Sequence, residues 1–302
     1  MKRAAVIATA GLAVGGALGA FYQYVFGREP GVLSVILDRK GHHADYYEHR
    51  DSDAQRLRQD NSCLRFTTYS PEGLELRGFY YPCGEAPCGK IAFLVHGYRS
   101  EHAEAAGMYR EYYRSRGFDL FCCDNRACGE SGGQLVGYGV YESGDCLRWI
   151  DFLRRRFGSD IQIALHGFSM GGATVLLMSD RVPENVRFIV SDCGFSAMRA
   201  LLKPRLGPLY WPLRLVNDFA AGYDFAAADV RPHLLRAKTP VLFIHGCEDR
   251  TVPTWMGREL YALCPTQKDC LFVENARHVE SFHRAPEAYA EKLDGFIGRY
   301  FS

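Results

Sequence analysis

Six short and uninterrupted apolar runs constrain the fold of this 302-residue chain more than any other feature. Runs of this kind are typical of strands that are buried on both faces of a parallel sheet. Most are separated by segments long enough for a helix, so we expect a parallel sheet with right-handed crossover connections. The runs are Lys90–Gly97, Phe118–Asn125, Ile161–Gly167, Phe188–Phe195, Pro240–Gly246 and Cys270–Asn275, and the helix-length segments are Glu101–Arg116, Tyr138–Phe157, Met170–Val182 and Thr254–Leu263.

Two segments depart from this alternation. Cys63–Ser70 and Leu74–Pro82 alternate between apolar and polar residues on either side of a turn that contains Gly73, which predicts an antiparallel hairpin. Residues 196–239 are rich in proline, leucine and aromatic residues, and we expect them to form a small cap inserted over the ends of the strands. We therefore predict one α/β domain over residues 63–302, with a mostly parallel, eight-stranded sheet and helices on both faces.

Charge and composition narrow the classes of function. Lys plus Arg total 36 and Asp plus Glu total 35, so the formal net charge is +1, and 47% of the residues are hydrophobic. Globular domains have about this apolar fraction, so the chain is neither disordered nor of low complexity. A balanced charge provides no basic field for nucleic acid, and we expect no such partner.

An uncharged run, Ala4–Phe26, follows Lys2 and Arg3. As a helix it would measure about 35 Å, enough to cross a bilayer core of about 30 Å. We predict that residues 1–30 form an uncleaved transmembrane signal anchor and that the rest of the chain lies outside the cytoplasm, because positive residues stay inside. The small-residue motif Ala17-x-Gly19 leaves a cleaved signal peptide, and hence a secreted protein, as one alternative. A soluble helix is another.

A polar neck is predicted for residues 31–62. It contains His42, His43 and His49, but no spacing of histidines and carboxylates there matches a known metal site. We therefore favour a solvated linker, or a helix that precedes the core, over a metal cluster.

Eleven cysteines occur without any C-x-x-C pair, which argues against a zinc ribbon or a thioredoxin-like motif. Several lie inside apolar runs, where a free cysteine behaves as a small buried hydrophobe. Two pairs are close enough in sequence to be bridged, namely Cys83 with Cys88 and Cys264 with Cys270.

The segment Gly167-Phe168-Ser169-Met170-Gly171 fits the pattern G-x-S-x-G. A predicted strand ends immediately before it and a predicted helix follows. In that context the pattern indicates a nucleophile elbow, in which small neighbours allow a strained turn to project the serine hydroxyl. Ser169 is therefore the candidate nucleophile.

A serine hydroxyl needs a base within hydrogen-bond reach, and a carboxylate must orient that base. Asp249 and His278 each follow one of the last two predicted strands, so we expect both at the edge of the sheet where the candidate nucleophile lies. Other candidates are Glu248 for the acid, and His245 and His283 for the base.

An attacked carbonyl oxygen becomes negatively charged and needs backbone N–H donors. Met170 should supply one donor, because it follows the candidate nucleophile at the start of a helix whose dipole favours anions. The loop after the first apolar run should supply the other, and Tyr98 is the candidate.

Five segments carry a resemblance to a known family, namely His96–Tyr98, Asp124–Ser131, His166–Gly172, His245–Pro253 and Ala276–Ser281. They resemble the α/β-hydrolase superfamily, and in particular bacterial serine hydrolases similar to monoacylglycerol lipases and serine aminopeptidases. The resemblance covers the chain from about Cys63 onward, and the chain order Ser…Asp…His also fits it. It implies an α/β-hydrolase fold, Ser169 as nucleophile with Asp249 and His278 as partners, and no metal or organic cofactor.

The expected function is hydrolysis of a carboxylic ester through an acyl-enzyme intermediate, as in carboxylesterases. The aromatic and largely uncharged cap favours a small-molecule ester with an apolar acyl or aryl group. A serine peptidase, amidase or thioesterase would use the same residues. A non-catalytic binding module tethered to the membrane is the alternative from a different class. The sequence specifies no oligomeric state.

Overall fold

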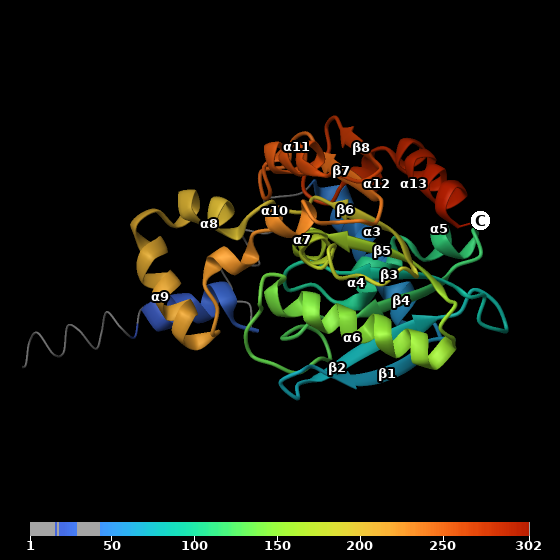
Figure 1. Cartoon of the computed structure of the whole chain (residues 1–302), viewed down its shortest axis with the longest axis horizontal. Helices are drawn as coiled ribbons and strands as arrows, with labels where there is room; N and C mark the ends of the chain where they lie inside the picture. Colours follow the sequence, from blue (N-terminus) through green and yellow to red (C-terminus); the bar gives the residue numbers. More distant parts are fainter. Residues whose placement is uncertain (1–15, 17, 29–42, 302) are drawn as a thin grey trace, which may run out of the picture.

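The computed structural model describes residues 16, 18–28 and 43–301. The strands in this part of the chain are β1 (Leu64–Tyr69), β2 (Glu75–Tyr81), β3 (Lys90–Val95), β4 (Asp119–Cys123), β5 (Gln162–Phe168), β6 (Val186–Asp192), β7 (Val241–Gly246) and β8 (Lys268–Val273). They form one eight-stranded sheet in the order β1-β2-β4-β3-β5-β6-β7-β8 (Figure 1). Strands β3 to β8 pair in parallel, whereas β2 pairs antiparallel with both β1 and β4. The predicted mostly parallel sheet and its hairpin are confirmed.

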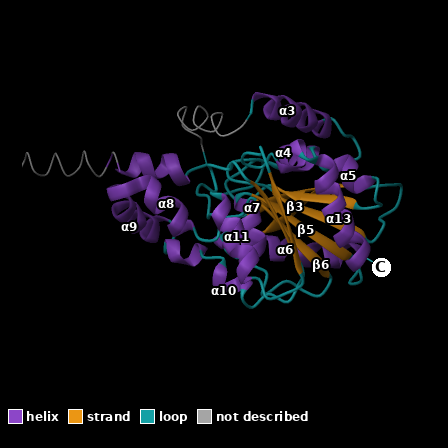
Figure 2. Ribbon diagram, turned by 90° about the horizontal axis from the view of Figure 1, so that it is seen from above, coloured by secondary structure: helices purple, strands orange, loops and turns teal. Residues whose placement is uncertain are grey.

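Helices cover both faces of this sheet (Figure 2). One face is covered by α3 (Ala44–Arg58), α4 (His102–Gly107), α5 (Arg110–Arg114) and α13 (Pro286–Tyr300). The other is covered by α6 (Val140–Phe157), α7 (Met170–Leu177), α10 (Arg231–Leu234) and α11 (Thr254–Leu263). Successive residues of β3 alternate between the two cores, with Phe93 in one and Leu94 in the other. Both faces of the sheet are therefore buried. Because no strand position there faces water, the strands appear in the sequence as uninterrupted apolar runs.

The helix predicted over Glu101–Arg116 is divided into α4 and α5. Helix α3 passes so close that a Cβ atom at Gly107 would lie 2.7 Å from the carbonyl carbon of Asp53. Helix α3 lies within the predicted neck, and its Ala54 and Leu57 are buried. A helix that packs on the core, and not a solvated linker, therefore occupies this part of the neck.

The described histidines of the predicted neck have ordinary hydrogen-bond partners. His43 hydrogen-bonds to the carboxylate of Glu280 at 2.6 Å, and a ring nitrogen of His49 lies 2.8 Å from the backbone oxygen of Asp45. Neither belongs to a group of potential metal ligands among the described residues, and His42 lies outside them. All eleven cysteines are free thiols.

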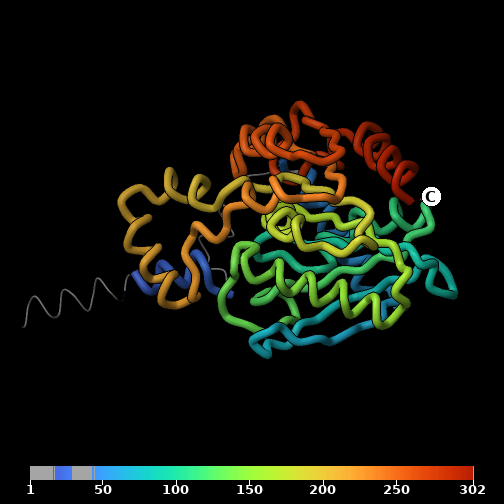
Figure 3. The backbone as a smooth tube through the Cα atoms, in the orientation of Figure 1, coloured from blue at the N-terminus to red at the C-terminus, as the bar shows by residue number. Residues whose placement is uncertain are grey.

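The cap is inserted between β6 and β7 and is mainly helical. It projects from the body of the molecule on the side opposite the C-terminus (Figure 1, Figure 3). Its elements, besides α10, are α8 (Met198–Leu206), the 3-10 turns η1 (Gly207–Leu209) and η2 (Phe225–Ala228), and α9 (Tyr210–Ala220).

Residues 18–26 are helical and lie against the cap, shown in blue beside α9 in Figure 1. Tyr22 and Phe26 are buried, and the Tyr22 hydroxyl donates to the Asn217 side chain of α9 at 3.0 Å. No helix in the described part of the chain is long and apolar enough to cross a membrane. The predicted transmembrane helix is therefore unsupported there, because these aromatic side chains pack on protein; the segment before residue 16 lies outside the described residues.

Candidate active site

A sharp turn joins β5 to α7, and Ser169 lies between the two elements with a φ of 55°. This left-handed conformation is unusual for a residue that has a side chain. Two glycines make room for the turn. A Cβ at Gly167 would lie 2.1 Å from the carbonyl oxygen of Gly171, and one at Gly171 would lie 2.0 Å from that of Val95. The local geometry is that of the predicted elbow.

The structure brings Ser169, His278 and Asp249 together from three different loops. The Nε2 atom of His278 lies 2.7 Å from the Oγ atom of Ser169, and its Nδ1 atom lies 2.6 Å from the Oδ2 atom of Asp249. Asp249 and His278 are both buried. The arrangement is a continuous hydrogen-bonded chain from a hydroxyl through an imidazole to a carboxylate, which is suited to activate the hydroxyl.

Electrostatics keep the Asp249 carboxylate charged. Burial alone would raise the pKa of Asp249, but the adjacent His278 and His245 side chains outweigh burial and hold this pKa well below its usual range. The backbone N–H groups of Thr251 and Val252 also donate to its Oδ1 atom, each at 2.8 Å. A permanently ionised carboxylate stabilises a protonated histidine beside it.

Of the competing candidates, His245 adjoins Asp249, with its Nε2 atom 3.4 Å from the Oδ2 atom of that carboxylate. Glu248 is exposed. His245 is buried beneath the site, with its Nε2 atom 2.9 Å from the backbone oxygen of Val252. His283 faces α3, where its Nε2 atom lies 3.2 Å from the Asp45 carboxylate. None of the three is hydrogen-bonded to the serine in the described structure.

A second buried carboxylate lies behind the histidine, and the sequence reasoning missed it because it ends an apolar run. Asp192 is the last residue of β6 and is fully buried. It accepts hydrogen bonds from the Tyr289 hydroxyl at 2.9 Å and from the Cys193 thiol at 3.1 Å. Burial raises the pKa of Asp192 to about 6.

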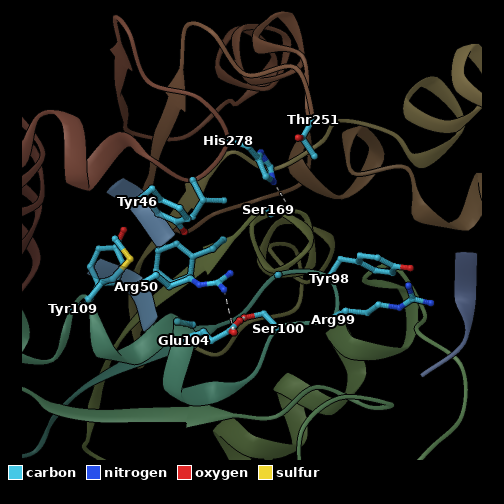
Figure 4. A pocket seen from close by; sticks show the side chains of 15 residues that line it. Tyr46, Arg50, Tyr98, Arg99, Ser100, Glu104, Tyr109, Ser169, Thr251 and His278 are labelled. Carbon is cyan, nitrogen blue, oxygen red and sulfur yellow. Dashed lines mark hydrogen bonds and ion pairs between the residues drawn. The ribbon is translucent and has the colours of Figure 1, made fainter. Parts of the chain in front are cut away.

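Both predicted oxyanion donors adjoin the serine. Met170 is the first residue of α7, and the first N–H groups of a helix have no partner within it. The loop of Gly97 and Tyr98 approaches from β3, where a Cβ at Gly97 would lie 3.3 Å from the Cβ of Ser169. The ring of Tyr98 points away from the serine (Figure 4), so only the backbone of this residue is placed to serve as a donor.

The side chains of the same loop are fixed by the N-terminal helix. The hydroxyls of Tyr98 and Tyr138 both donate to the backbone oxygen of Val25, at 2.6 and 3.2 Å. The Arg99 guanidinium donates to the backbone oxygen of Gly27 at 2.8 Å. The carbonyls at the end of the 18–26 helix thus hold the loop that carries one candidate oxyanion donor. No sequence signal indicated this contact.

A cavity of about 260 Å³ opens beside the serine (Figure 4). Ser169 and His278 line one side, and Tyr46 and Arg50 of α3 line another. The Arg50 guanidinium lies 3.6 Å from the Glu104 carboxylate. This side of the site is polar, and residues that the sequence placed in a neck contribute to it.

A second cavity, of about 330 Å³, lies on the cap side of the same serine. Most of the side chains that line it are apolar, including Phe195, Leu201, Leu202 and Val252. Ser169 therefore lies between an apolar cavity and a polar one.

Comparisons with known proteins agree with this architecture. Residues 93–222 match the family model described as alpha/beta hydrolase fold. The uncharacterized protein YqkD of Bacillus subtilis is 27% identical over 243 residues, which cover 77% of this chain and 78% of that protein. The mouse (Mus musculus) alpha/beta hydrolase domain-containing protein 17C is 26% identical over 277 residues, covering 90% of this chain and 76% of that protein.

Solved structures share the fold at low sequence identity. The esterase Pf2001 of Pyrococcus furiosus superposes with a TM-score of 0.64 at 20% identity, over 80% of this chain and 93% of that one. Est1E of Butyrivibrio proteoclasticus, solved with bound ferulic acid, gives 0.65 at 16% identity, over 78% and 99%. Together with the eight-stranded sheet and the elbow, these matches show that the chain has the α/β-hydrolase fold.

Proposed function

We propose that the protein hydrolyses carboxylic esters through an acyl-enzyme intermediate on Ser169. The observation that carries this proposal is the hydrogen-bonded chain from Ser169 through His278 to Asp249, with distances of 2.7 and 2.6 Å. The esterase Pf2001, which shares the fold, is in keeping with it.

The geometry supports a two-step reaction. His278 Nε2 accepts the proton of Ser169 as the serine oxygen attacks the ester carbonyl carbon, and Asp249 holds the resulting imidazolium. The backbone N–H groups of Met170 and Tyr98 stabilise the oxyanion. The imidazolium then gives its proton to the departing alcohol. A water molecule, activated by the same histidine, releases the acid and restores the serine.

The two cavities favour an ester whose acyl and alcohol groups differ in polarity. The cap-side cavity, with Leu201 and Leu202, suits an apolar acyl or aryl group, whose burial there removes apolar surface from water. The cavity beside α3, with Arg50 and Glu104, suits a polar alcohol. We propose small-molecule esters of this kind as the substrate class.

The test is a panel of p-nitrophenyl esters of increasing acyl length, assayed with the wild type and with Ser169→Ala. We expect turnover by the wild type and a loss of about 10⁴-fold or more in kcat for the variant. Equal rates for the two proteins would overturn the proposal.

A peptidase, amidase or thioesterase activity is the second candidate, because these reactions use the same residues. The fold is shared with part of an acylaminoacyl peptidase of Pyrococcus horikoshii, over 79% of this chain and 41% of that one, at 18% identity and a TM-score of 0.61. Matched amides and thioesters assayed beside the esters discriminate the candidates, since faster turnover of either would reverse this order. A folded protein that a fluorophosphonate probe does not label would favour a non-catalytic binding module.

We also propose that the enzyme works at a membrane surface. Trp211, Leu215 and Phe219 recur every four residues on α9, and 48%, 70% and 94% of their surfaces are exposed. Helices with such an exposed apolar face bind in the interface of a bilayer. The helix over residues 18–26, part of the uncharged N-terminal run, packs beside α9. An extracytoplasmic location, anchored or secreted, is in keeping with that run.

A further inference from the structure

Two cysteines and a buried carboxylate meet at the edge of the sheet opposite to the candidate active site. Cys83 and Cys88 lie in the loop between β2 and β3, and Asp119 begins β4. The two sulfur atoms and a carboxylate oxygen all lie within 4.8 Å of one another. We propose that these three residues bind a soft divalent metal ion such as zinc.

The position follows from the register of the sheet. Asp119 pairs with Ile91 at the beginning of β3, and β5 also begins at this edge. Ser169 follows the opposite, carboxyl end of β5. A metal at Asp119 would therefore hold the β2–β3 loop and would not take part in hydrolysis.

The carboxylate of Asp119 is buried and makes no ion pair among the described residues. It is fully buried and accepts hydrogen bonds from the Tyr80 hydroxyl at 2.6 Å and from the backbone N–H groups of Cys83 and Cys88 at 2.8 and 3.0 Å. Among the ion pairs of the described residues, none includes Asp119. Buried charges are normally paired or bound to a metal.

The donor set suits zinc. Two thiolates and one carboxylate oxygen supply three ligands, and thiolates select soft ions over magnesium or calcium. Cys88 is exposed, so water has access to a fourth, tetrahedral position. Binding replaces two thiol protons by the ion, so that one Zn²⁺ enters and two H⁺ leave.

The ion also changes the chemistry of the thiols. Without it, burial and the neighbouring Cys88 and Asp119 raise the pKa of Cys83 to about 12. A bound cation reverses this effect, because a coordinating thiol is deprotonated. A disulfide would use the same two sulfur atoms, with two protons and two electrons passing to an oxidant such as a small-molecule disulfide. It would leave the buried Asp119 carboxylate without an ion-pair partner, which is why we favour the metal.

The test uses the full-length chain, reduced and freed of metal, titrated with Co²⁺ as a spectroscopic substitute for zinc. We expect one Co²⁺ per chain, the thiolate-to-cobalt absorption of a tetrahedral site, and displacement of the cobalt by Zn²⁺. The double variant Cys83→Ser/Cys88→Ser should lose this absorption. The matched control Cys63→Ser/Cys247→Ser, which replaces two half-buried cysteines elsewhere, should keep it.

Asp119→Asn should weaken cobalt binding at least tenfold and leave the thiolate absorption in place at saturation. Ester hydrolysis, monitored in parallel, reports that each variant is folded. The proposal is overturned if the reduced wild type binds no cobalt, or if the absorption survives in the Cys83→Ser/Cys88→Ser variant. If the protein binds no metal but forms a disulfide between these two cysteines on mild oxidation, the metal-site proposal is wrong and the pair forms a disulfide instead.

Discussion

At the scale of single residues, the proposed reaction depends on which tautomer His278 adopts. The Nδ1 atom of this histidine lies 2.6 Å from Asp249, which keeps the proton on Nδ1 and leaves Nε2 free to accept from Ser169. An amide in place of the carboxylate would have the same shape but would hold the opposite tautomer.

We therefore predict that Asp249→Asn lowers kcat by about 10⁴-fold, with little change in KM. The measurement is steady-state hydrolysis of a p-nitrophenyl ester. Glu248→Gln is the matched control, because it removes a charge from the neighbouring, exposed position, and it should retain wild-type activity. A loss in both variants would show that the acid has been assigned to the wrong residue.

Asp192 should produce a different pH dependence. Burial raises its pKa to about 6 from 3.8, so between these values the folded state binds a proton that the unfolded state releases. The contribution of Asp192 to the free energy of unfolding is thus greatest below pH 4 and is lost as the pH rises through 6. Asp249, whose pKa is lowered, contributes stability above pH 4 that is lost in acid.

Asp192→Asn removes one of these two effects. We predict that the difference in the free energy of unfolding between wild type and variant changes by about 2 kcal/mol between pH 4 and pH 7, in favour of the wild type at the lower pH. Urea denaturation at a series of pH values measures this difference. A difference that does not vary with pH would contradict the prediction.

At the scale of elements, the elbow and its neighbouring helices respond differently to an added methyl group. Gly171→Ala would force a Cβ to within 2.0 Å of the Val95 carbonyl oxygen, and we predict a loss of about 3 kcal/mol or more. Gly144 lies within α6 with no atom near its missing Cβ. Gly144→Ala should therefore stabilise the protein by about 0.5–1 kcal/mol. Thermal unfolding compares the two, and equal changes would contradict the crowding argument.

The helix over residues 18–26 should affect catalysis through the loop of Tyr98. Tyr98→Phe removes the hydroxyl that donates to Val25 but keeps the backbone N–H. Because one hydrogen bond contributes about 1 kcal/mol, we predict a three- to tenfold lower kcat with nearly unchanged KM. Tyr69→Phe, at an exposed ring on β1, is the control. A higher KM with unchanged kcat would instead assign the loop to substrate binding.

The sequence predicted elements whose signal is local. The strands and the turn at Ser169 are encoded by consecutive residues, since runs buried on both faces need no polar position. Helix α3 was harder to predict because it is polar along most of its length, with only residues such as Ala54 and Leu57 buried. Contacts between distant segments, such as Val25 with Tyr98, leave no periodic trace in either segment.

In the candidate site too, residues marked by local sequence could be predicted, whereas residues placed by long-range packing could not. Ser169, Asp249 and His278 follow strand ends, so the topology alone brings them together. Asp192 and Arg50 were missed because their positions depend on burial and on how α3 packs, which sequence spacing does not encode.

At the scale of the whole molecule, the proposed association with a membrane depends on the exposed face of α9. Replacing Trp211, Leu215 and Phe219 together by serine should lower binding to vesicles of anionic and zwitterionic phospholipid at least tenfold, since each buried side chain contributes about 1.5–3 kcal/mol. Flotation with the vesicles measures the bound fraction.

The control replaces Leu64, Tyr69 and Trp255 by serine. These residues are 45%, 59% and 51% exposed and lie outside the cap, so binding should persist. Similar losses of binding in the two triple variants, or no loss in either, would contradict membrane binding through the exposed face of α9.

The contacts of the N-terminal helix also define the shortest chain that still holds the loop of Tyr98 beside the active site. A protein that began after Arg28 would lack the acceptors for the hydroxyls of Tyr98 and Tyr138. Cleavage after Gly19 would leave every one of these acceptors in place. An anchored form and a released form of the enzyme would therefore keep the same contacts around the active site, and a shortened version made for the laboratory would keep them only if it included Val25 and Gly27.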